Sequence, residues 1–330
     1  MENVSTRYSS RIDRLEDVMD LAKKVAEVYG LGIVGSVKVL EIGYEDFNAV
    51  VSMQRDGENK YFLKVFVNSR TDDEAKEIMG RMLAAQSVGV STPEIYANPQ
   101  TKEYLTEIKI EESRFRLCLI KYVDGDDFFS LGHKPDDNEL LEIVEAASKI
   151  AKSDFRPKFI YDTWAINNFL IEWEKKKQYL KGDDLAIVEK IVDEFSKFCY
   201  DDLPKCFVHG DIRSTNVLKA KADGKIYVID WSVSNYVPRL NEIAVICGDL
   251  ALLVGDLEKS VRRVKAAFGR WTELVRADEF ERESFGMVYR VANAINIMNT
   301  NYEIATGNTS DETMMHLNAG RFGLQAGERL

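Results

Sequence analysis

The amino-acid sequence predicts an α+β protein in which a small antiparallel sheet precedes a larger, mainly helical region. Short runs rich in Val and aromatic residues alternate with turn signals between Val37 and Val67, a pattern typical of antiparallel strands. From Pro135 onward, long segments carry apolar residues at helical spacing. The 330-residue length allows one large or two modest domains, and we expect two, over residues 1–122 and 123–330.

The amino-terminal region begins with a predicted helix over about residues 10–29, where apolar residues recur every three or four positions. Three strands follow this helix. They cover Val37–Leu40, Ala49–Met53 and Tyr61–Val67. The dipeptide Asp56-Gly57 separates the second strand from the third and is a signal for a hairpin turn.

A helix with an apolar stripe is predicted next, from about Asp72 to Gln86. Two more strands, Tyr104–Lys109 and Phe115–Tyr122, complete the predicted sheet. The remaining chain is mainly helical. Its predicted helices are Asn138–Lys152, Asp162–Lys181, Leu185–Tyr200, Arg239–Val254, Leu257–Arg276, Asp278–Thr300 and Ser310–Gly327.

The composition, 45% hydrophobic and 30% charged, is ordinary for a water-soluble globular protein. No apolar run approaches the roughly 20 residues that span a bilayer, and Met1–Asp20 lacks the apolar core of a signal peptide. The net charge of −11 argues against nucleic acid as main partner, because phosphate binding favours a basic surface. The cysteines lack CxxC spacing, which indicates free thiols. We expect a cytoplasmic monomer or homodimer with no membrane or nucleic acid partner.

The most informative segment runs from Val208 to Leu218 and reads His-Gly-Asp, four residues, Asn, between apolar residues. It is followed by Ile226–Trp231, a β-rich run that ends in an acid and an aromatic residue. An ordinary loop between two buried strands explains a lone His-Gly-Asp. The combination with Asn216 and Asp230 favours a catalytic site instead.

Phosphoryl transfer from ATP requires these residue types. Its transition state is loose and highly anionic, so the protein must position the reactants and neutralise charge. We expect Asp211 to orient the attacking hydroxyl group and to accept its proton. Asn216 and Asp230 provide the oxygen ligands that Mg²⁺ prefers. His209 is expected to tie the catalytic loop to neighbouring backbone.

At these residues the chain resembles the aminoglycoside phosphotransferase and choline kinase superfamily, the small-molecule relatives of protein kinases. The resemblance implies a bilobal, protein-kinase-like fold with a nucleotide-binding amino-terminal lobe and a catalytic, substrate-binding carboxy-terminal lobe. It also implies ATP- and Mg²⁺-dependent transfer to a hydroxyl group. Gly210 and Trp231-Ser232 stand where protein kinases usually carry Arg and Phe-Gly, which favours the small-molecule branch.

The resemblance implies that Lys64, in the third strand, contacts the α- and β-phosphates of ATP; the alternative is an outward-facing lysine of an alternating strand. An acid of the next helix is expected to orient it, and helical phase favours Glu74, with Glu77 as the alternative. Gly43 lies between the first two strands, where it lets backbone approach the phosphates, although a plain hairpin connection explains it equally well. The side chain of Asp46 is expected to point away from the phosphates.

Backbone groups of Ile120, Tyr122 and Val123 are expected to hydrogen-bond the edge of adenine at the hinge between the lobes. Two further residues have open roles. Arg213 contacts the γ-phosphate or an anionic part of the substrate, or it is a solvated surface arginine. Glu242 stands where the family usually has an Asp that braces the catalytic loop, and the longer side chain leaves its role open.

The leading hypothesis is therefore an ATP-dependent kinase that acts on a hydroxyl group of a small molecule. A nucleotide-binding pseudokinase with a regulatory role is the alternative, which the presence of Asp211, Asp230 and Lys64 disfavours. A Ser/Thr protein kinase is less favoured still, because the HRD arginine and the DFG glycine are absent. A hydrolase is disfavoured because no G-x-S-x-G motif is present.

The sequence leaves the acceptor open among amino alcohols, aminoglycosides, sugars and homoserine-like compounds. Acidic residues after the hinge, namely Asp124, Asp126, Asp127 and Glu172, suit an amine-bearing substrate. Solvated surface acids are the simpler interpretation of each.

Overall fold

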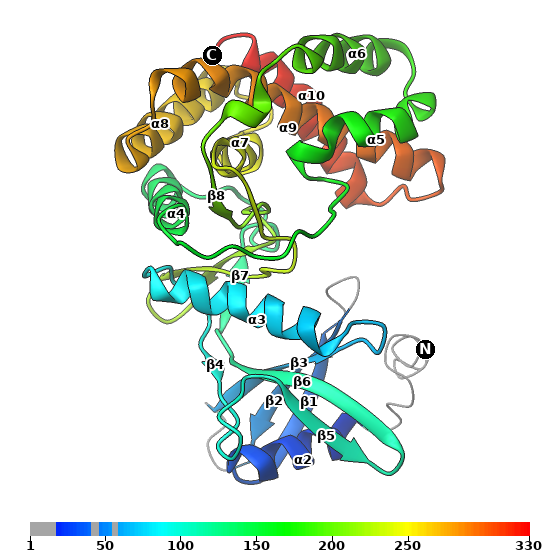
Figure 1. Ribbon diagram of the computed structural model, residues 1–330, viewed down its shortest axis with the longest axis vertical. Coiled ribbons are helices and arrows are strands. Elements are labelled where there is room, and N and C mark those ends of the chain that lie inside the picture. The colour runs from blue at the N-terminus through cyan, green and yellow to red at the C-terminus, as the bar shows by residue number, and fades with distance from the viewer. Residues whose placement is uncertain (1–17, 41–45, 55–58) are drawn as a thin grey trace. The chain divides into compact units, whose positions relative to one another are not determined.

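The computed structural model describes residues 18–40, 46–54 and 59–330 and confirms the predicted α+β class (Figure 1). The chain forms two compact units. The first contains the described residues up to Leu83 together with Thr92–Asp124. The second contains Ala84–Ser91 and Gly125–Leu330. The predicted boundary between residues 122 and 123 placed Ala84–Ser91 with the amino-terminal region. The structure places this segment in the second unit.

The first unit is built on an antiparallel sheet with the strand order β1-β2-β3-β6-β4, in which β5 also pairs with β6. Val and aromatic residues are frequent in the first three strands, as expected from their preference for a pleated surface. The strands are β1 (Val34–Leu40), β2 (Phe47–Met53), β3 (Lys60–Phe66), β4 (Ile95–Tyr96), β5 (Thr106–Ile110) and β6 (Ser113–Lys121). The predicted turn at Asp56-Gly57 lies outside the described residues.

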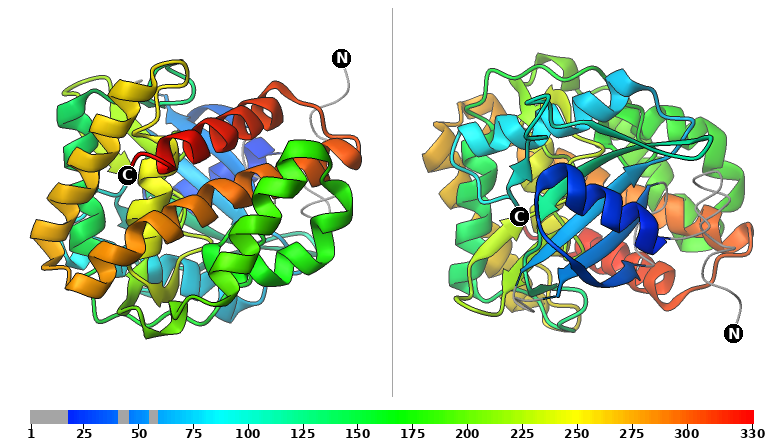
Figure 2. Two further views of the ribbon diagram at one scale, coloured as in Figure 1. Left: turned by 90° about the horizontal axis from the view of Figure 1, so that it is seen from above. Right: turned by 90° about the horizontal axis from the view of Figure 1, so that it is seen from below.

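One face of this sheet is covered by α2 (Val18–Tyr29), which crosses the strands in Figure 2. Its buried residues, among them Leu21 and Val25, share a hydrophobic core with Leu63 of β3 and Leu117 of β6. Removing such apolar side chains from water stabilises the fold by about 1.5–3 kcal/mol each. The helical spacing of α2 is therefore explained by its contact with the sheet.

The helix that follows β3, α3 (Asp72–Ser87), starts in the first unit with a capping box. The Thr71 hydroxyl accepts a hydrogen bond from the Glu74 N–H (3.2 Å), and the Glu74 carboxylate accepts one from the Thr71 N–H (2.6 Å). This reciprocal pair satisfies two backbone donors at the start of the helix. The local sequence Thr-x-x-Glu is thus sufficient to explain where α3 starts.

The second unit is mainly helical, and the most extensive packing of its longest helix, α9 (Glu279–Ala305), is against four other helices. These are α5 (Phe169–Lys176), α6 (Gly182–Ser196), α7 (Leu240–Asp249) and α10 (Asp311–Gly327). The remaining helices are α4 (Asp137–Ile150) and α8 (Leu257–Val275). At Gly323 of α10, an added Cβ would lie 1.9 Å from the Asn293 side chain, so only glycine allows α10 to approach α9 this closely. None of the described helices is long and apolar enough to cross a membrane.

Short antiparallel strands of the second unit frame the His-Gly-Asp segment. One pair joins β8 (Lys205–Val208) to β11 (Asn235–Pro238), and the other joins β9 (Val217–Ala220) to β10 (Ile226–Val228). A third strand, β7 (Gly125–Asp127), pairs with β9 on its other side.

The continuous helix predicted over Asp162–Lys181 is wrong. The segment instead contains two short 3₁₀ turns on either side of the eight-residue α5. Asp162 accepts a hydrogen bond from the Trp164 N–H (3.0 Å), and Asn168 donates to the Asp162 backbone carbonyl (2.7 Å). These local bonds compete with the helical ones and hold the chain in a loop.

Candidate active site

The strands of the second unit bring the three predicted catalytic residues together. Asp211 follows the end of β8, Asn216 immediately precedes β9, and Asp230 follows β10. The Ile229 N–H donates to the Asn216 backbone carbonyl (3.0 Å), which holds the end of β10 beside Asn216. The Asn216 amide group donates to Asp211 at both its carboxylate (2.6 Å) and its backbone carbonyl (2.9 Å). The loop after β8 and the end of β10 thus lie side by side, and their polar residues form one cluster.

His209 ties this cluster together through both ring nitrogens. Nε2 lies 2.9 Å from the Ile229 carbonyl and Nδ1 lies 3.2 Å from the Asp211 N–H. Because Nδ1 accepts a hydrogen bond, Nε2 carries the proton and the ring is neutral. Complete burial against Trp231 lowers the pKa of His209 to about 4, which keeps that state at neutral pH. The expected structural role of His209 agrees with these contacts.

Asp211 has the titration behaviour of a general base. Although 35% of its side chain is exposed, the protein around the carboxylate removes much of its hydration, and this raises its pKa to about 7. The nearby carboxylates of Asp162, Asp230 and Asp249 raise the pKa further, and Arg213 opposes them. A base with a pKa near neutrality is well matched to proton transfer.

Asp230 adopts a conformation that is uncommon outside glycine. Its φ is 60°, in the left-handed region, and its side chain is exposed. The Ser232 N–H donates to its Oδ1 (3.3 Å). Residues held in such conformations concentrate at functional sites, where the surrounding structure enforces them.

The Asn216 and Asp230 side chains form a donor set that fits Mg²⁺. Asn216 turns its amide nitrogen toward Asp211, so its oxygen points elsewhere, and the Asp230 carboxylate is exposed. Magnesium takes one or two protein ligands and completes its octahedron with phosphate and water oxygens. In the part of the chain that the structure describes, no cluster of three or more His, Cys, Asp or Glu residues could hold a metal ion.

The catalytic loop is held on one side by Glu242 of α7. Its buried carboxylate accepts hydrogen bonds from the His209 N–H and from the Gly210 N–H (3.3 Å). Burial raises the pKa of Glu242 to about 7, which the two hydrogen bonds partly oppose. Gly210 has a φ of 84°, a conformation that glycine adopts without strain. The longer side chain at position 242 therefore does reach the catalytic loop.

The other side of the loop is held by Asp249, from the same helix. Asp249 lies seven residues after Glu242, two helical turns along the same face of α7. Its carboxylate accepts hydrogen bonds from the Ser214 N–H (3.0 Å) and hydroxyl group. The Lys134 ammonium group lies 2.9 Å from the same carboxylate. One helix thus anchors the backbone on both sides of Asp211.

The pKa of Asp249 reflects this set of partners. Burial on its own raises the pKa of a carboxyl group, but Lys134, Arg213 and the Ser214 hydrogen bond together lower that of Asp249 to about 2. Asp249 is therefore a permanent anion at neutral pH, whereas Asp211 titrates near neutrality. Neither Asp249 nor Lys134 was expected from the sequence, although a spacing of seven residues from Glu242 is a signal that both acids share one helix face.

Arg213 is a buried member of the cluster, so its interpretation as a solvated surface arginine is wrong. Its Nε lies 3.0 Å from Oδ1 of Asp211, and only 12% of its side chain is exposed. Its Nη1 donates to the side chain of Asn296 on α9 (3.1 Å), and the guanidinium group lies 5.9 Å from the Trp164 ring centre. Arg213 therefore connects Asp211 to the segment that contains Trp164 and to α9.

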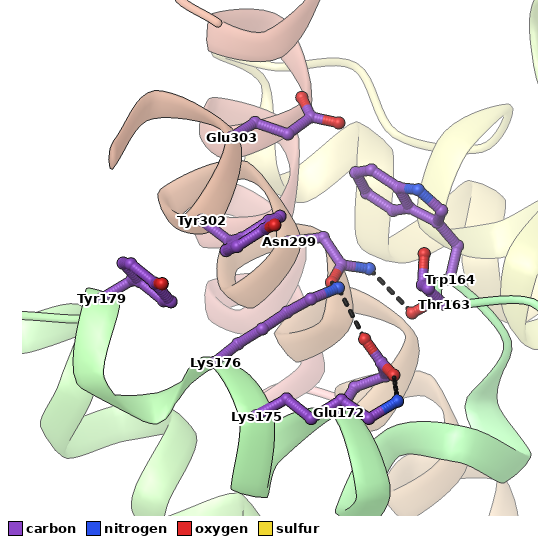
Figure 3. A pocket seen from close by; sticks show the side chains of 9 residues that line it. All are labelled: Thr163, Trp164, Glu172, Lys175, Lys176, Tyr179, Asn299, Tyr302 and Glu303. Carbon is purple, nitrogen blue, oxygen red and sulfur yellow. Dashed lines mark hydrogen bonds and ion pairs between the residues drawn. The ribbon is translucent and has the colours of Figure 1, made fainter. Parts of the chain in front are cut away.

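A cavity of about 440 Å³ lies beyond Trp164 and is shown in Figure 3. It is lined by aromatic, charged and amide side chains from the loop before α5, from α5 and the turn after it, and from α9. Glu172 lies at its base between Lys175 (2.7 Å) and Lys176 (2.6 Å) and is 1% exposed. The interpretation of Glu172 as a solvated surface acid is therefore wrong, because both lysines stabilise its buried charge.

Lys64, in the first unit, lies 3.3 Å from the carboxylate of Asp46, which also pairs with Arg70 (3.4 Å). Both basic side chains are largely buried. A lysine in a strand of large apolar residues is stabilised by such a partner. Asp46 thus turns toward the residue that was expected to hold the phosphates.

The other residues predicted for nucleotide binding are placed as follows. Glu74 is exposed and its carboxylate caps α3 through Thr71, while Glu77 lies one turn further along the helix and is partly buried. Ile120 is in β6, and Tyr122 and Val123 lie between β6 and β7, where the chain leaves the first unit. Gly43 lies outside the described residues.

Comparison with known proteins shows what the chain resembles. Residues 37–280 match the model of a family described as the phosphotransferase enzyme family. No curated protein sequence matches the chain.

Solved structures of several kinases share the fold. Spectinomycin phosphotransferase APH(9)-Ia, crystallised with ADP and spectinomycin, is 13% identical, with a TM-score of 0.66 over 96% of this chain and 100% of that one. A microcompartment-associated aminopropanol kinase is 13% identical, with a TM-score of 0.65 over 95% and 97% of the two chains. The choline kinase LicA from Streptococcus pneumoniae is 12% identical, with a TM-score of 0.57 over 94% and 100%. The predicted kinase-like fold and family resemblance are confirmed.

Proposed function

The chain belongs to the phosphotransferase enzyme family, and we propose that it transfers the γ-phosphoryl group of ATP to a hydroxyl group of a small molecule. The observation that carries this proposal is the Asp211 carboxylate, which has a pKa of about 7 and is held on a loop anchored from both sides by α7. The structural neighbours support a hydroxyl acceptor, since spectinomycin, choline and aminopropanol are all alcohols.

Asp211 binds and orients the acceptor hydroxyl group through a hydrogen bond to its carboxylate. As the acceptor oxygen forms a bond to the γ-phosphorus, the bond from that phosphorus to the bridging oxygen of ADP breaks, and the hydroxyl proton passes to Asp211. Arg213 fixes one carboxylate oxygen of Asp211 and Asn216 fixes the other. Because both oxygens are fixed, the Asp211 carboxylate is already in position before the transition state forms.

Asn216 and Asp230 are proposed to hold Mg²⁺, which when bound to ATP neutralises negative charge on the phosphates. Their exposed or outward-turned oxygens support this role. The positive charge of bound Mg²⁺ would also lower the pKa of Asp211, because an adjacent cation favours the ionised carboxylate.

In the first unit, Lys64 is proposed to contact the ATP phosphates. Its ion pair with Asp46 makes Asp46 a better candidate for the orienting acid than Glu74, whose carboxylate already caps α3. Glu77 remains the alternative on α3. Residues 1–122 are proposed as the nucleotide-binding lobe and residues 123–330 as the catalytic lobe.

Backbone groups of Ile120, Tyr122 and Val123 are proposed to contact adenine. Gly43 is proposed to lie over the phosphates.

Two substitutions test the proposal. Asp211→Ala should abolish transfer but leave the affinity for ATP·Mg²⁺ nearly intact, because it removes the base and keeps both metal ligands. Asp230→Ala should weaken nucleotide binding only when Mg²⁺ is present. The measurements are ATP consumption with a panel of alcohols and calorimetric titration with ATP, with and without Mg²⁺. Unchanged turnover in Asp211→Ala, or equal effects of Mg²⁺ on wild type and Asp230→Ala, would show that the assignment is wrong.

A further inference from the structure

We propose that the cavity beyond Trp164 takes a neutral, hydroxyl-rich acceptor, a sugar or a cyclitol, in preference to a cationic one. This inference rests on the proposed function, because it identifies the cavity as the site of the phosphorylated alcohol. The cavity of about 440 Å³ is large enough for a compact small molecule. Its position, charge, aromatic faces and hydrogen-bonding groups each support the inference.

The position of the cavity connects it to the catalytic carboxylate. Trp164 lines the cavity, and the Arg213 guanidinium group that lies over its ring also pairs with Asp211. Asn299 of α9 lines the cavity as well, and Asn296, one turn earlier on that helix, binds Arg213. An acceptor in the cavity thus lies beside the residues that contact Asp211, and for transfer its reacting hydroxyl group must extend past Trp164 to that carboxylate.

The formal charges that line the cavity cancel, since Lys175 and Lys176 balance Glu172 and Glu303. Glu172 cannot serve as a free anionic site for an amine, because both its oxygens already contact lysine ammonium groups (2.7 and 2.6 Å). The Glu303 carboxylate accepts a hydrogen bond from the Thr313 hydroxyl (3.0 Å). A cationic acceptor would therefore have to displace an internal ion pair before it could use Glu172 as its counter-charge.

Cations of the protein itself lie over two of the aromatic rings that line the cavity and over a third ring nearby. Lys176 lies 5.1 Å from the ring centre of Tyr302, and Arg213 lies 5.9 Å from that of Trp164. Lys175 lies 4.6 Å from the ring centre of Tyr161, which is close to the cavity. Recognition of a quaternary ammonium group depends on open aromatic faces. A choline-like acceptor thus finds one face of each of these three rings occupied by a protein cation.

The polar groups that remain at the cavity suit hydroxyl groups. Lys175, with 55% of its side chain exposed, can donate hydrogen bonds, and the Glu303 carboxylate can accept them. The Tyr179 and Tyr302 hydroxyl groups do both. A hydroxyl group also donates and accepts, so a polyol can satisfy this mixed lining without bringing a net charge into it.

The first test uses sets of acceptors that share one ring and differ in charge: glucose, glucosamine and glucuronate, with equivalent sets from other hexoses, and myo-inositol and choline as further probes. Binding to the wild-type protein is measured by calorimetry, and transfer by ATP consumption. The expected result is that at least one neutral compound binds, and that its kcat/KM exceeds that of its charged counterparts by about tenfold or more. Preference for the charged member of each set, or no binding of any neutral compound, overturns the inference.

The second test changes the charge of the cavity. In Lys175→Gln, Glu172 loses one counter-charge, so the ratio of kcat/KM for the amino sugar to kcat/KM for the neutral sugar should rise by about tenfold. Lys177→Gln is the matched control, because Lys177 lies two residues further on, pairs with Glu174 and does not line the cavity. Equal selectivity of the two variants would overturn the inference.

These outcomes are distinct from failure of the proposed function. Transfer to choline or to an aminoglycoside alone, dependent on Asp211, would keep the kinase assignment and overturn the inference. Binding of neutral sugars without transfer of phosphate to any alcohol would overturn the kinase assignment and, with it, the identification of the cavity as the acceptor site.

Discussion

The hydrogen bonds between Glu242 of α7 and the catalytic loop predict that Glu242→Gln reduces turnover and changes stability little. The carboxylate of Glu242 accepts hydrogen bonds from the backbone N–H groups of His209 and Gly210. Glutamine has the same shape but offers one acceptor oxygen and one NH₂ group. One of the two backbone donors would then face another donor, which costs about 1–3 kcal/mol.

The loss of charge acts in the opposite direction. The pKa of Glu242 rises from 4.5 to about 7, so its ionised form is disfavoured in the folded protein by about 3 kcal/mol relative to water. Glutamine removes this penalty above pH 7. The two effects are of similar size, and we expect the free energy of unfolding at pH 8 to change by no more than about 1 kcal/mol.

Turnover, in contrast, should fall steeply. Gly210 directly precedes Asp211, so a repelled N–H group displaces the catalytic carboxylate, and a shift of about 1 Å can reduce the rate by about 10²-fold. The assays are denaturant unfolding and kcat with the best acceptor. Glu242→Asp, which keeps the charge, should lose less activity. Glu258→Gln, at an exposed glutamate on α8, should match wild type in both assays. A Glu242→Gln variant with kcat within about threefold of wild type would refute the role of Glu242 in positioning Asp211.

Three further predictions concern the same cluster. The kcat/KM for the acceptor at saturating ATP·Mg²⁺ should rise with pH as Asp211 loses its proton, around a midpoint that bound Mg²⁺ places below 7, and in Arg213→Met the midpoint should move to higher pH, because Arg213 lowers the pKa of Asp211; an unchanged midpoint would contradict this. Neutral His209, whose pKa is lowered from 6.5 to about 4, should contribute about 3 kcal/mol of stability that is complete above pH 6.5 and is lost as the pH falls through 4; denaturant unfolding should therefore show that between pH 7 and 4 the free energy of unfolding of wild type falls by about 3 kcal/mol relative to that of His209→Gln, and equal pH dependence of the two proteins would contradict this. Asp249→Asn should lower the free energy of unfolding by about 2–3 kcal/mol, because it leaves Lys134 without its counter-charge, and a stability equal to wild type would exclude a net contribution from this pair.

Much of the site could be predicted because its residues are close in sequence. Asp211 and Asn216 belong to one loop, and Asp230 follows the next strand. The local pattern therefore contains both the chemistry and most of the geometry. Local signals also explain the start of α3, where Thr71 and Glu74 form a capping box, although helical phase had favoured a different role for Glu74.

Long-range partners could not be predicted in the same way. The contact of Lys64 with Asp46 depends on the register between β2 and β3 and on the side of the strand from which each side chain projects. Glu172 looked like one of many surface acids; its lysine partners are local, three and four residues further along α5, but only the packing of α5 against α9 buries the group. Helical periodicity likewise missed the loop at Asp162, because hydrogen bonds from Trp164 and Asn168 compete with those of a helix.

The sequence by itself determined the reaction class of this protein, the antiparallel sheet and the identity of the Asp211, Asn216 and Asp230 cluster. These properties depend on residue type and short spacing, which are explicit in the chain. The tertiary structure decided that α7 anchors the catalytic loop at two points, that Arg213 is buried against Asp211, and that the cavity beyond Trp164 has balanced charges. Those properties arise because folding brings distant side chains together and removes them from water, which changes their pKa values and partners in ways that no local pattern records.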